Sequence, residues 1–292
     1  MTQPGSGGEG GAGSASGSGA MTSFDEIYDR PDPRDFFRVL GRWGYQTPQH
    51  AQGVFRRLVA ARSDGPVTVL DLCCSYGINA ALLNHDLTWA DLHDHYTSPQ
   101  AAALTTAELI ARDRAYYAAR RRPDAVRAIG LDPAAHALAY ARAVGLLDEG
   151  FAENLEAAAP SPGLLRAAED TGLITVTGGA SFLTPRTFRP LLAAARQPVW
   201  VAAFVLRTGS YQAIAEGLTS EGLVTEKAAE PTYPQRRFTD ADEQRHAVDA
   251  VTALGEDPRG KEADGCFHTA VHLSRPAEDA GNPPLTAFLA EA

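Results

Sequence analysis

Residues 67–72 form a continuous apolar and β-branched run that leads directly into a turn of small residues, Cys73-Cys74-Ser75. A short run without polar alternation is typical of a strand buried on both faces of a parallel sheet. A helix is expected to begin at residues 78–83. A second apolar run, 126–131, precedes Asp132-Pro133, which predicts a helix start, and Gly145 can close that helix in a left-handed cap. The repeating unit is therefore strand, helix, strand.

The rest of the chain continues this alternation. Further strands are expected at 173–177 and 199–206, and helices at 35–43, 50–61, 187–195 and 211–221. Strands at 223–227 and 268–274 lack a strong helix between them, so we expect an antiparallel, hairpin-like pair there. The pattern predicts an α/β fold, with a doubly wound, mostly parallel sheet, helices on both faces and a terminal antiparallel strand pair.

Four regions are expected along the chain. Residues 1–20 are rich in Gly and Ser and predict a disordered tail without the features of a signal peptide; Met21 follows, which suggests a dispensable extension or an early start codon. Residues 21–66 predict a helical cap, 67–276 a Rossmann-like domain and 277–292 a C-terminal tail. Residues 85–124 predict a helical insertion in which Thr88 and Ser98 begin two helices, the second running to about Arg120.

Charge and cysteine usage exclude several classes of partner. The formal net charge of -10 gives no general attraction to nucleic acid or anionic membranes. The longest apolar run, 199–206, is far shorter than the roughly 20 residues that span a bilayer. The three cysteines suggest neither a disulfide framework nor a zinc site. We expect a cytoplasmic protein, and the sequence leaves its oligomeric state open.

The turn after the first strand is the main functional signal. In open α/β sheets, ligands bind beyond the carboxyl ends of the strands, at the switch point. Small residues are needed there because the backbone must approach the ligand closely. An acid at the end of the second strand, here Asp132, can accept hydrogen bonds from both hydroxyls of a ribose.

These residues resemble the first motif of the class I S-adenosylmethionine-dependent methyltransferases, usually Asp-Leu-Gly-Cys-Gly-x-Gly. Asp71, Leu72, Cys74 and Gly77 match it, whereas Cys73 and Ser75 replace two glycines. The resemblance runs from about residue 67 to 276 and implies transfer of a methyl group from S-adenosyl-L-methionine to a small molecule. The Gly-x-Gly-x-x-Gly fingerprint of a nicotinamide dehydrogenase is missing. A methyltransferase-like protein that only binds or regulates a partner is the alternative.

The resemblance also implies a set of site residues. The expected cofactor contacts are Asp71, Cys73, Ser75, Tyr76, Gly77, Asp132, Pro133, Glu153, Asn154, Thr177 and Gly178. Asp132 is the expected ribose ligand, with Asp91 and Asp94 as alternatives, and Glu153 or Asn154 would contact the adenine. The expected acceptor contacts are Tyr45, Gly179, Phe182 and Arg236. Tyr28, Tyr45, Tyr76 or Phe182 could face the sulfonium.

Methyl transfer needs little more than alignment of donor and nucleophile, so a base is required only if the acceptor carries a proton. His93, His95 and Tyr211 are the candidates for catalytic side chains. His93 and His95 are two residues apart in a predicted helix and do not share a face, which argues against a metal site. The acceptor and the methylated atom remain open.

Overall fold

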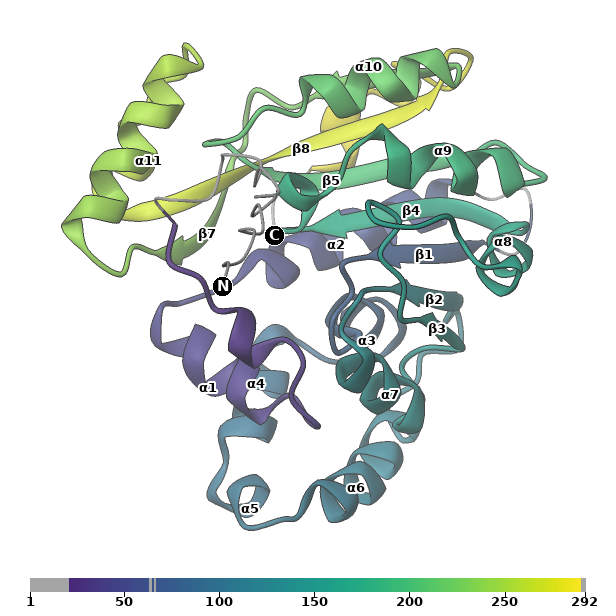
Figure 1. Cartoon of the computed structure of the whole chain (residues 1–292), viewed down its shortest axis with the longest axis vertical. Coiled ribbons are helices and arrows are strands. Elements are labelled where there is room, and N and C mark those ends of the chain that lie inside the picture. Colours follow the sequence, from purple (N-terminus) through teal and green to yellow (C-terminus); the bar gives the residue numbers. More distant parts are fainter. Residues whose placement is uncertain (1–20, 63–64, 66, 290–292) are drawn as a thin grey trace, which may run out of the picture.

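The computed structural model describes residues 21–62, 65 and 67–289, and contains one eight-stranded mixed sheet (Figure 1). The strand order is β3-β2-β1-β4-β5-β8-β6, and β7 also pairs with β8. The strands are β1 (Thr68–Leu72), β2 (Arg127–Leu131), β3 (Glu149–Phe151), β4 (Thr171–Thr177), β5 (Trp200–Leu206), β6 (Leu223–Lys227), β7 (Tyr233–Arg237) and β8 (Cys266–Pro276). Strands β1 to β5 are parallel, and β8 is antiparallel to its neighbours. The predicted fold class is therefore confirmed.

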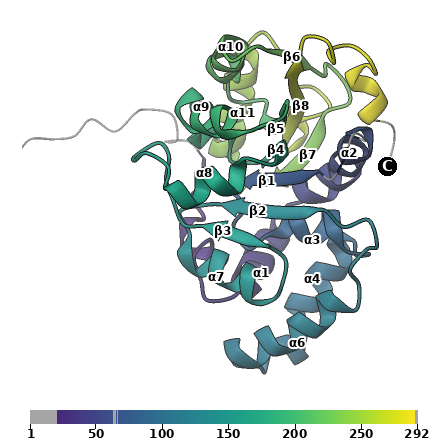
Figure 2. The ribbon, with the colours of Figure 1, turned by 90° about the vertical axis from the view of Figure 1, so that its right-hand side faces the viewer.

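Helices cover both faces of this sheet, as Figure 2 shows for α8 and α9 on one side and α2 on the other. The helices are α1 (Arg34–Arg42), α2 (Thr47–Ala61), α3 (Ile78–Asn84), α4 (Trp89–Thr97), α5 (Pro99–Ala102), α6 (Thr106–Ala118), α7 (Ala135–Ala143), α8 (Pro162–Ala168), α9 (Pro185–Ala194), α10 (Gln212–Ser220) and α11 (Ala241–Ala253). Successive side chains of a strand are buried on opposite faces of the sheet: Val69 packs against the α2 layer, and Leu70 packs against the layer of α8 to α10. This two-sided burial explains the apolar runs in the sequence.

The N-terminal helices and the insertion pack together as a third helical layer. Phe36 of α1 forms ring contacts with Tyr76 behind β1 and Trp89 of α4, with centroids 6.0 and 6.5 Å apart. The ends of the insertion meet, because His85 forms a β-bridge with Arg121. No helix in the described part of the chain is long and apolar enough to cross a membrane.

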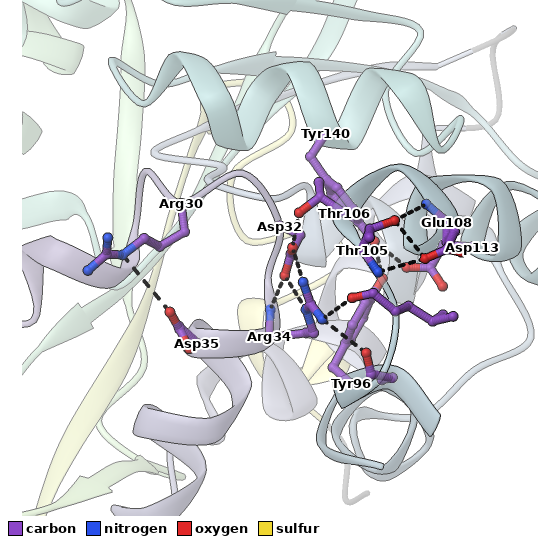
Figure 3. Close-up of polar contacts among 12 residues, drawn as sticks. Arg30, Asp32, Arg34, Asp35, Tyr96, Thr105, Thr106, Glu108, Asp113 and Tyr140 are labelled. Atoms are coloured by element: carbon purple, nitrogen blue, oxygen red, sulfur yellow. Dashed lines mark hydrogen bonds and ion pairs between the residues drawn. The ribbon is translucent and has the colours of Figure 1, made fainter. Parts of the chain in front are cut away.

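Hydrogen bonds from an ion pair of the N-terminal segment join this segment to the insertion (Figure 3). Asp32 pairs with Arg34 at 2.7 Å and accepts a hydrogen bond from the Thr106 hydroxyl at 2.7 Å. The Arg34 guanidinium also donates to the carbonyl oxygens of Ala101 and Leu104, at 3.0 and 2.7 Å. Both partners are largely buried, so these contacts fix the segment before α1 against the insertion.

Several predicted boundaries were wrong. The α2 helix begins at Thr47, three residues before the predicted start, because Pro48 occupies its first turn. The insertion holds three helices instead of two: Thr105 forms a capping box with Glu108 and starts α6 separately. The α7 helix begins at Ala135, because Asp132 and Pro133 remain in the loop.

The region between β6 and β8 was also wrongly predicted. It contains β7 and the 13-residue helix α11, capped by the Asp240 side chain, where the sequence suggested a simple hairpin. The stretch after β8, predicted as a tail, packs Leu285 and Phe288 into the core beside α2. Residues 1–20 and 290–292 lie outside the described residues.

Candidate cofactor and acceptor site

The loop after β1 keeps a glycine-like backbone at residues that are not glycine. Cys73 and Ser75 have φ values of 55° and 46°, and Gly77, which precedes α3, has a φ of 72°. A left-handed conformation costs an L-residue roughly 1–2 kcal/mol. Such strain persists only where the surroundings impose it, and it clusters at functional sites. Cys73 and Ser75 therefore adopt a backbone conformation that glycine would adopt more readily.

Asp132 holds this loop from the end of β2. Its carboxylate accepts hydrogen bonds from the Ser75 N–H at 2.9 Å and from the Ala134 N–H at 2.8 Å. A carboxylate offers about four lone-pair positions, so half of its capacity remains for a ligand. Burial is the main cause of the raised pKa of Asp132. The alternatives to Asp132 lie elsewhere: Asp91 caps α4, and Asp94 is exposed on the same helix.

Asp71, inside β1, belongs to a buried hydrogen-bond network that supports the site from below. It accepts from the Thr175 hydroxyl at 2.7 Å and from the Asn79 amide at 2.9 Å. The same amide donates to Thr177 at 2.8 Å, which joins the ends of β1 and β4 through α3. Burial raises the pKa of Asp71 to about 7, against these hydrogen bonds, and the charge of Asp132 adds to the increase.

We predict that Asp71 makes protein stability depend on pH. A carboxyl whose pKa is raised on folding stabilises the folded state while protonated and loses that contribution as the pH rises. Relative to Asp71→Asn, the free energy of unfolding of the wild type should fall by about 1.4 kcal/mol per pH unit between about pH 5 and pH 7. Urea denaturation across this range measures the difference. Parallel curves for the two proteins would contradict the prediction.

The loop after β4 contacts the β1 loop directly. A Cβ atom on Gly179 would lie 2.5 Å from the Cβ and Sγ atoms of Cys73, so only glycine fits there. Gly178 has a φ of 77°, and a Cβ on it would lie 3.5 Å from the Tyr45 hydroxyl. The structure therefore brings Cys73, Gly178, Gly179 and Tyr45 together, and their ligand contacts stay predictions.

We predict steric coupling between Gly179 and Cys73. Gly179→Ala should destabilise the protein by about 1–3 kcal/mol through overpacking, and Cys73→Gly should recover most of that loss by removing the atoms in conflict. A double-mutant cycle in urea measures the coupling. Gly145→Ala is the control for a loss of stability without a clash, because Gly145 has a φ of 82°, which strains alanine, but no neighbour within 4 Å of its Cβ position. The coupling would be contradicted if Cys73→Gly restored no stability to Gly179→Ala. It would also be contradicted if Cys73→Gly restored the stability of Gly145→Ala equally well.

Glu153 and Asn154, the predicted adenine contacts, lie in the loop after β3 and both make local hydrogen bonds. Glu153 accepts from the N–H and hydroxyl of Ser161, which caps α8. The exposed Asn154 accepts from the Glu156 N–H at 3.0 Å. Pro133 is exposed beside Asp132, and Phe182 is 68% exposed after the β4 loop. Ligand contacts by these residues stay predictions.

Two predicted contacts need correction because their polar groups already have protein partners. Tyr76 is fully buried, and its hydroxyl bonds to Ile27 and Arg30 in the segment before α1, so it anchors that segment and does not face a ligand. Arg236 is 2% exposed and pairs with Glu243 at 2.7 Å, which leaves no free guanidinium to clamp an acceptor.

The histidine candidates of the insertion are engaged in packing and ion pairs. His95 lies 2.6 Å from Asp113, which is fully buried, and its ring stacks on Tyr116 with a centroid distance of 3.9 Å. His93 packs against Gly41 of α1 and lies 3.6 Å from Asp94. These contacts are to α1, α4 and α6, so the structure does not bring the two histidines together with the predicted cofactor contacts.

Tyr211, the third candidate, borders a separate cavity of about 340 Å³ between β5, β8 and α10. Its ring packs on His272 with a centroid distance of 4.5 Å. No residue of the β1 loop lines this cavity. The structure therefore does not bring Tyr211 together with the predicted cofactor contacts.

Sequence reasoning missed Gln235, whose amide nitrogen lies 3.9 Å from the Cβ position of Gly178, and His50, which packs on Tyr233 of the same strand. His50 is in the first turn of α2, and Gln235 is in β7, a strand that was not predicted. The available signal was Thr47-Pro48, a typical helix start that would have placed His50 on the same helix face as Thr47.

Comparison with known proteins finds likenesses among solved structures alone, since no family model and no curated protein matches the sequence. The N-methyltransferase NodS from Bradyrhizobium japonicum WM9, in complex with S-adenosyl-L-homocysteine, is 12% identical with a TM-score of 0.44, over 87% of this chain and 96% of that chain. The plantazolicin methyltransferase BamL, in complex with a triazolic desmethylPZN analog and the same ligand, is 12% identical with a TM-score of 0.43, over 86% of this chain and 96% of that chain. At these values the likeness assigns no function, so the chain's own residues must carry the proposal.

Proposed function

We propose that this protein is an S-adenosylmethionine-dependent methyltransferase that acts on a small molecule. The observation that carries the proposal is the left-handed backbone at Cys73 and Ser75, held by Asp132 at the switch point of the sheet. The buried Ser75 hydroxyl, which lacks a hydrogen-bond partner, is an orphaned polar atom in the same loop. Strain and an unpaired polar atom at this place favour a binding site over a simple turn.

The chemical types of the residues around the β1 loop suit S-adenosylmethionine. Asp132 would accept hydrogen bonds from the ribose hydroxyls, and the backbone of Ser75 to Gly77 and of Gly178-Gly179 would lie against the rest of the donor. When bound, the donor supplies a methyl group activated by a sulfonium. The protein then has to bind the acceptor, align it and exclude water. The acidic charge and three free cysteines agree with a small-molecule enzyme of the cytoplasm.

Release of adenosylhomocysteine tests this function. The protein should form it from S-adenosylmethionine when a cell extract freed of macromolecules is present, and much more slowly without the extract. Gly179→Ala should suppress the release, whereas Gly145→Ala should retain it. Tight binding of adenosylhomocysteine without any release from any extract would favour the alternative, a methyltransferase-like binding protein.

A further inference from the structure

Three polar side-chain atoms where α2 packs beside β7 are buried without a hydrogen-bond partner at normal distance: His50 Nε2, Gln235 Oε1 and Thr47 Oγ1, the last of which lies near the Tyr45 hydroxyl. Thr47 and His50 are three residues apart on α2 and share a helix face. Gln235 is joined to the start of this helix by the hydrogen bond from the Gln46 N–H to its carbonyl oxygen, at 2.8 Å. Buried polar atoms without partners are rare, and three in one place indicate a missing polar ligand.

These atoms belong to the same region as the two glycines after β4. Gln235 is 5% exposed, and its amide nitrogen lies 3.9 Å from the position of a Cβ on Gly178. The Tyr45 hydroxyl approaches the same position to 3.5 Å. Because Gly179 approaches Cys73 of the β1 loop, Tyr45 and Gln235 lie beside the donor site proposed above. The Tyr233 ring packs against His50, with ring centroids 5.2 Å apart.

The chemistry of the three atoms selects the ligand. An amide oxygen only accepts hydrogen bonds, so Gln235 Oε1 requires a ligand with an O–H or N–H group. Burial lowers the pKa of His50, so its imidazole is neutral at pH 7 and Nε2 can accept a proton. None of the three side chains carries a charge. A charged ligand would lose its hydration here without a counter-ion.

We propose that Thr47, His50 and Gln235 form the methyl-acceptor pocket, and that it takes an uncharged small molecule through a hydroxyl or N–H group. This inference rests on the proposed function. The acceptor heteroatom uses its lone pair to bond the methyl carbon, and its proton passes to His50 Nε2. The electron pair of the broken carbon–sulfur bond stays on sulfur. His50 is then a catalytic residue, whereas Thr47 and Gln235 determine acceptor specificity.

Apolar replacements of these residues should raise stability and remove activity together. A polar residue kept for a ligand is costly to the free protein, so Thr47→Val and Gln235→Met should raise the melting temperature by about 2–4 °C. Methyl transfer from tritiated S-adenosylmethionine to a cell extract freed of macromolecules should fall about 10-fold or more in both. His50→Leu should lose about 100-fold or more, because it removes the base. The affinity for adenosylhomocysteine should stay within about twofold in all three.

Thr171→Val is the matched control. Thr171 is also a buried threonine whose hydroxyl has no partner, but it lies at the amino end of β4, away from the pocket. It should gain stability as Thr47→Val does and keep full methyl transfer. A loss of activity in the control equal to that in Thr47→Val would overturn the pocket. Three other results would also overturn the pocket: unchanged activity in His50→Leu, lower stability in both Thr47→Val and Gln235→Met, or labelled products that are methylated carboxylates. A wild type that fails to bind adenosylhomocysteine would instead refute the donor site.

Discussion

Asp132→Ala should weaken binding of S-adenosylhomocysteine about 100-fold. The substitution removes the carboxylate that ends β2 and the hydrogen bond that holds the Ser75 N–H. Two hydrogen bonds from ribose hydroxyls to a charged oxygen contribute about 1.5 kcal/mol each, and about 3 kcal/mol corresponds to this change in affinity. Isothermal titration of both proteins measures it.

Asp148→Ala is the control for this substitution. Asp148 also accepts a backbone hydrogen bond, from the Ala128 N–H at 2.8 Å, but near the start of β2 instead of its end. Its loss should lower stability without a comparable effect on affinity. Equal weakening by the two substitutions would mean that Asp132 acts through the backbone alone, which would contradict its role as a ligand contact.

Phe36→Ala should destabilise the protein by about 3–5 kcal/mol, the usual cost of removing a buried phenylalanine ring. Phe36 is 3% exposed and lies at the centre of an aromatic cluster with Tyr28, Phe37, Tyr45, Tyr76 and Trp89. It should also weaken adenosylhomocysteine binding, because the cluster positions Tyr45 beside Gly178. Chemical denaturation and titration at a temperature where both proteins are folded measure the two effects.

Phe55→Ala separates the loss of stability from the loss of binding. Phe55 is 2% exposed on α2 and packs against Phe204 of β5, with ring centroids 5.8 Å apart. Its removal should cost a similar amount of stability but leave affinity within about twofold. If the two variants lose affinity equally, the aromatic cluster has no specific role at the site.

The sequence was sufficient to predict the fold class because the central strands are buried on both faces. Val69 and Leu70 point to opposite helical layers, and this is what makes the run of apolar residues continuous. The half-exposed strand β7, which includes Pro234 and pairs irregularly with β8, has no such pattern, and it was missed. The cap at Thr88 located the start of α4, but the capping box at Thr105 and the Asp240 cap of α11 were missed.

The proposed donor contacts could be named from the sequence, but Thr47, His50 and Gln235 of the proposed acceptor pocket could not. Cys73, Ser75 and Asp132 follow apolar strands, so local pattern and the general rule for open sheets place them together. Tyr76 contacts Ile27 across 49 residues of sequence, and Arg236 pairs with Glu243 across the turn from β7 to α11, two elements that were not predicted. The packing of β7 beside α2, which brings Gln235 next to the start of that helix, was likewise not visible in the sequence.

Titration of the protein from Met21 onward with S-adenosylhomocysteine and with NAD tests the central claim most directly. We predict saturable binding of one adenosylhomocysteine per chain and no binding of NAD, because the loop lacks the glycine fingerprint that a dinucleotide requires. Absence of adenosylhomocysteine binding, or binding of NAD at comparable affinity, would contradict the assignment of the β1 loop and Asp132 to a methyl donor.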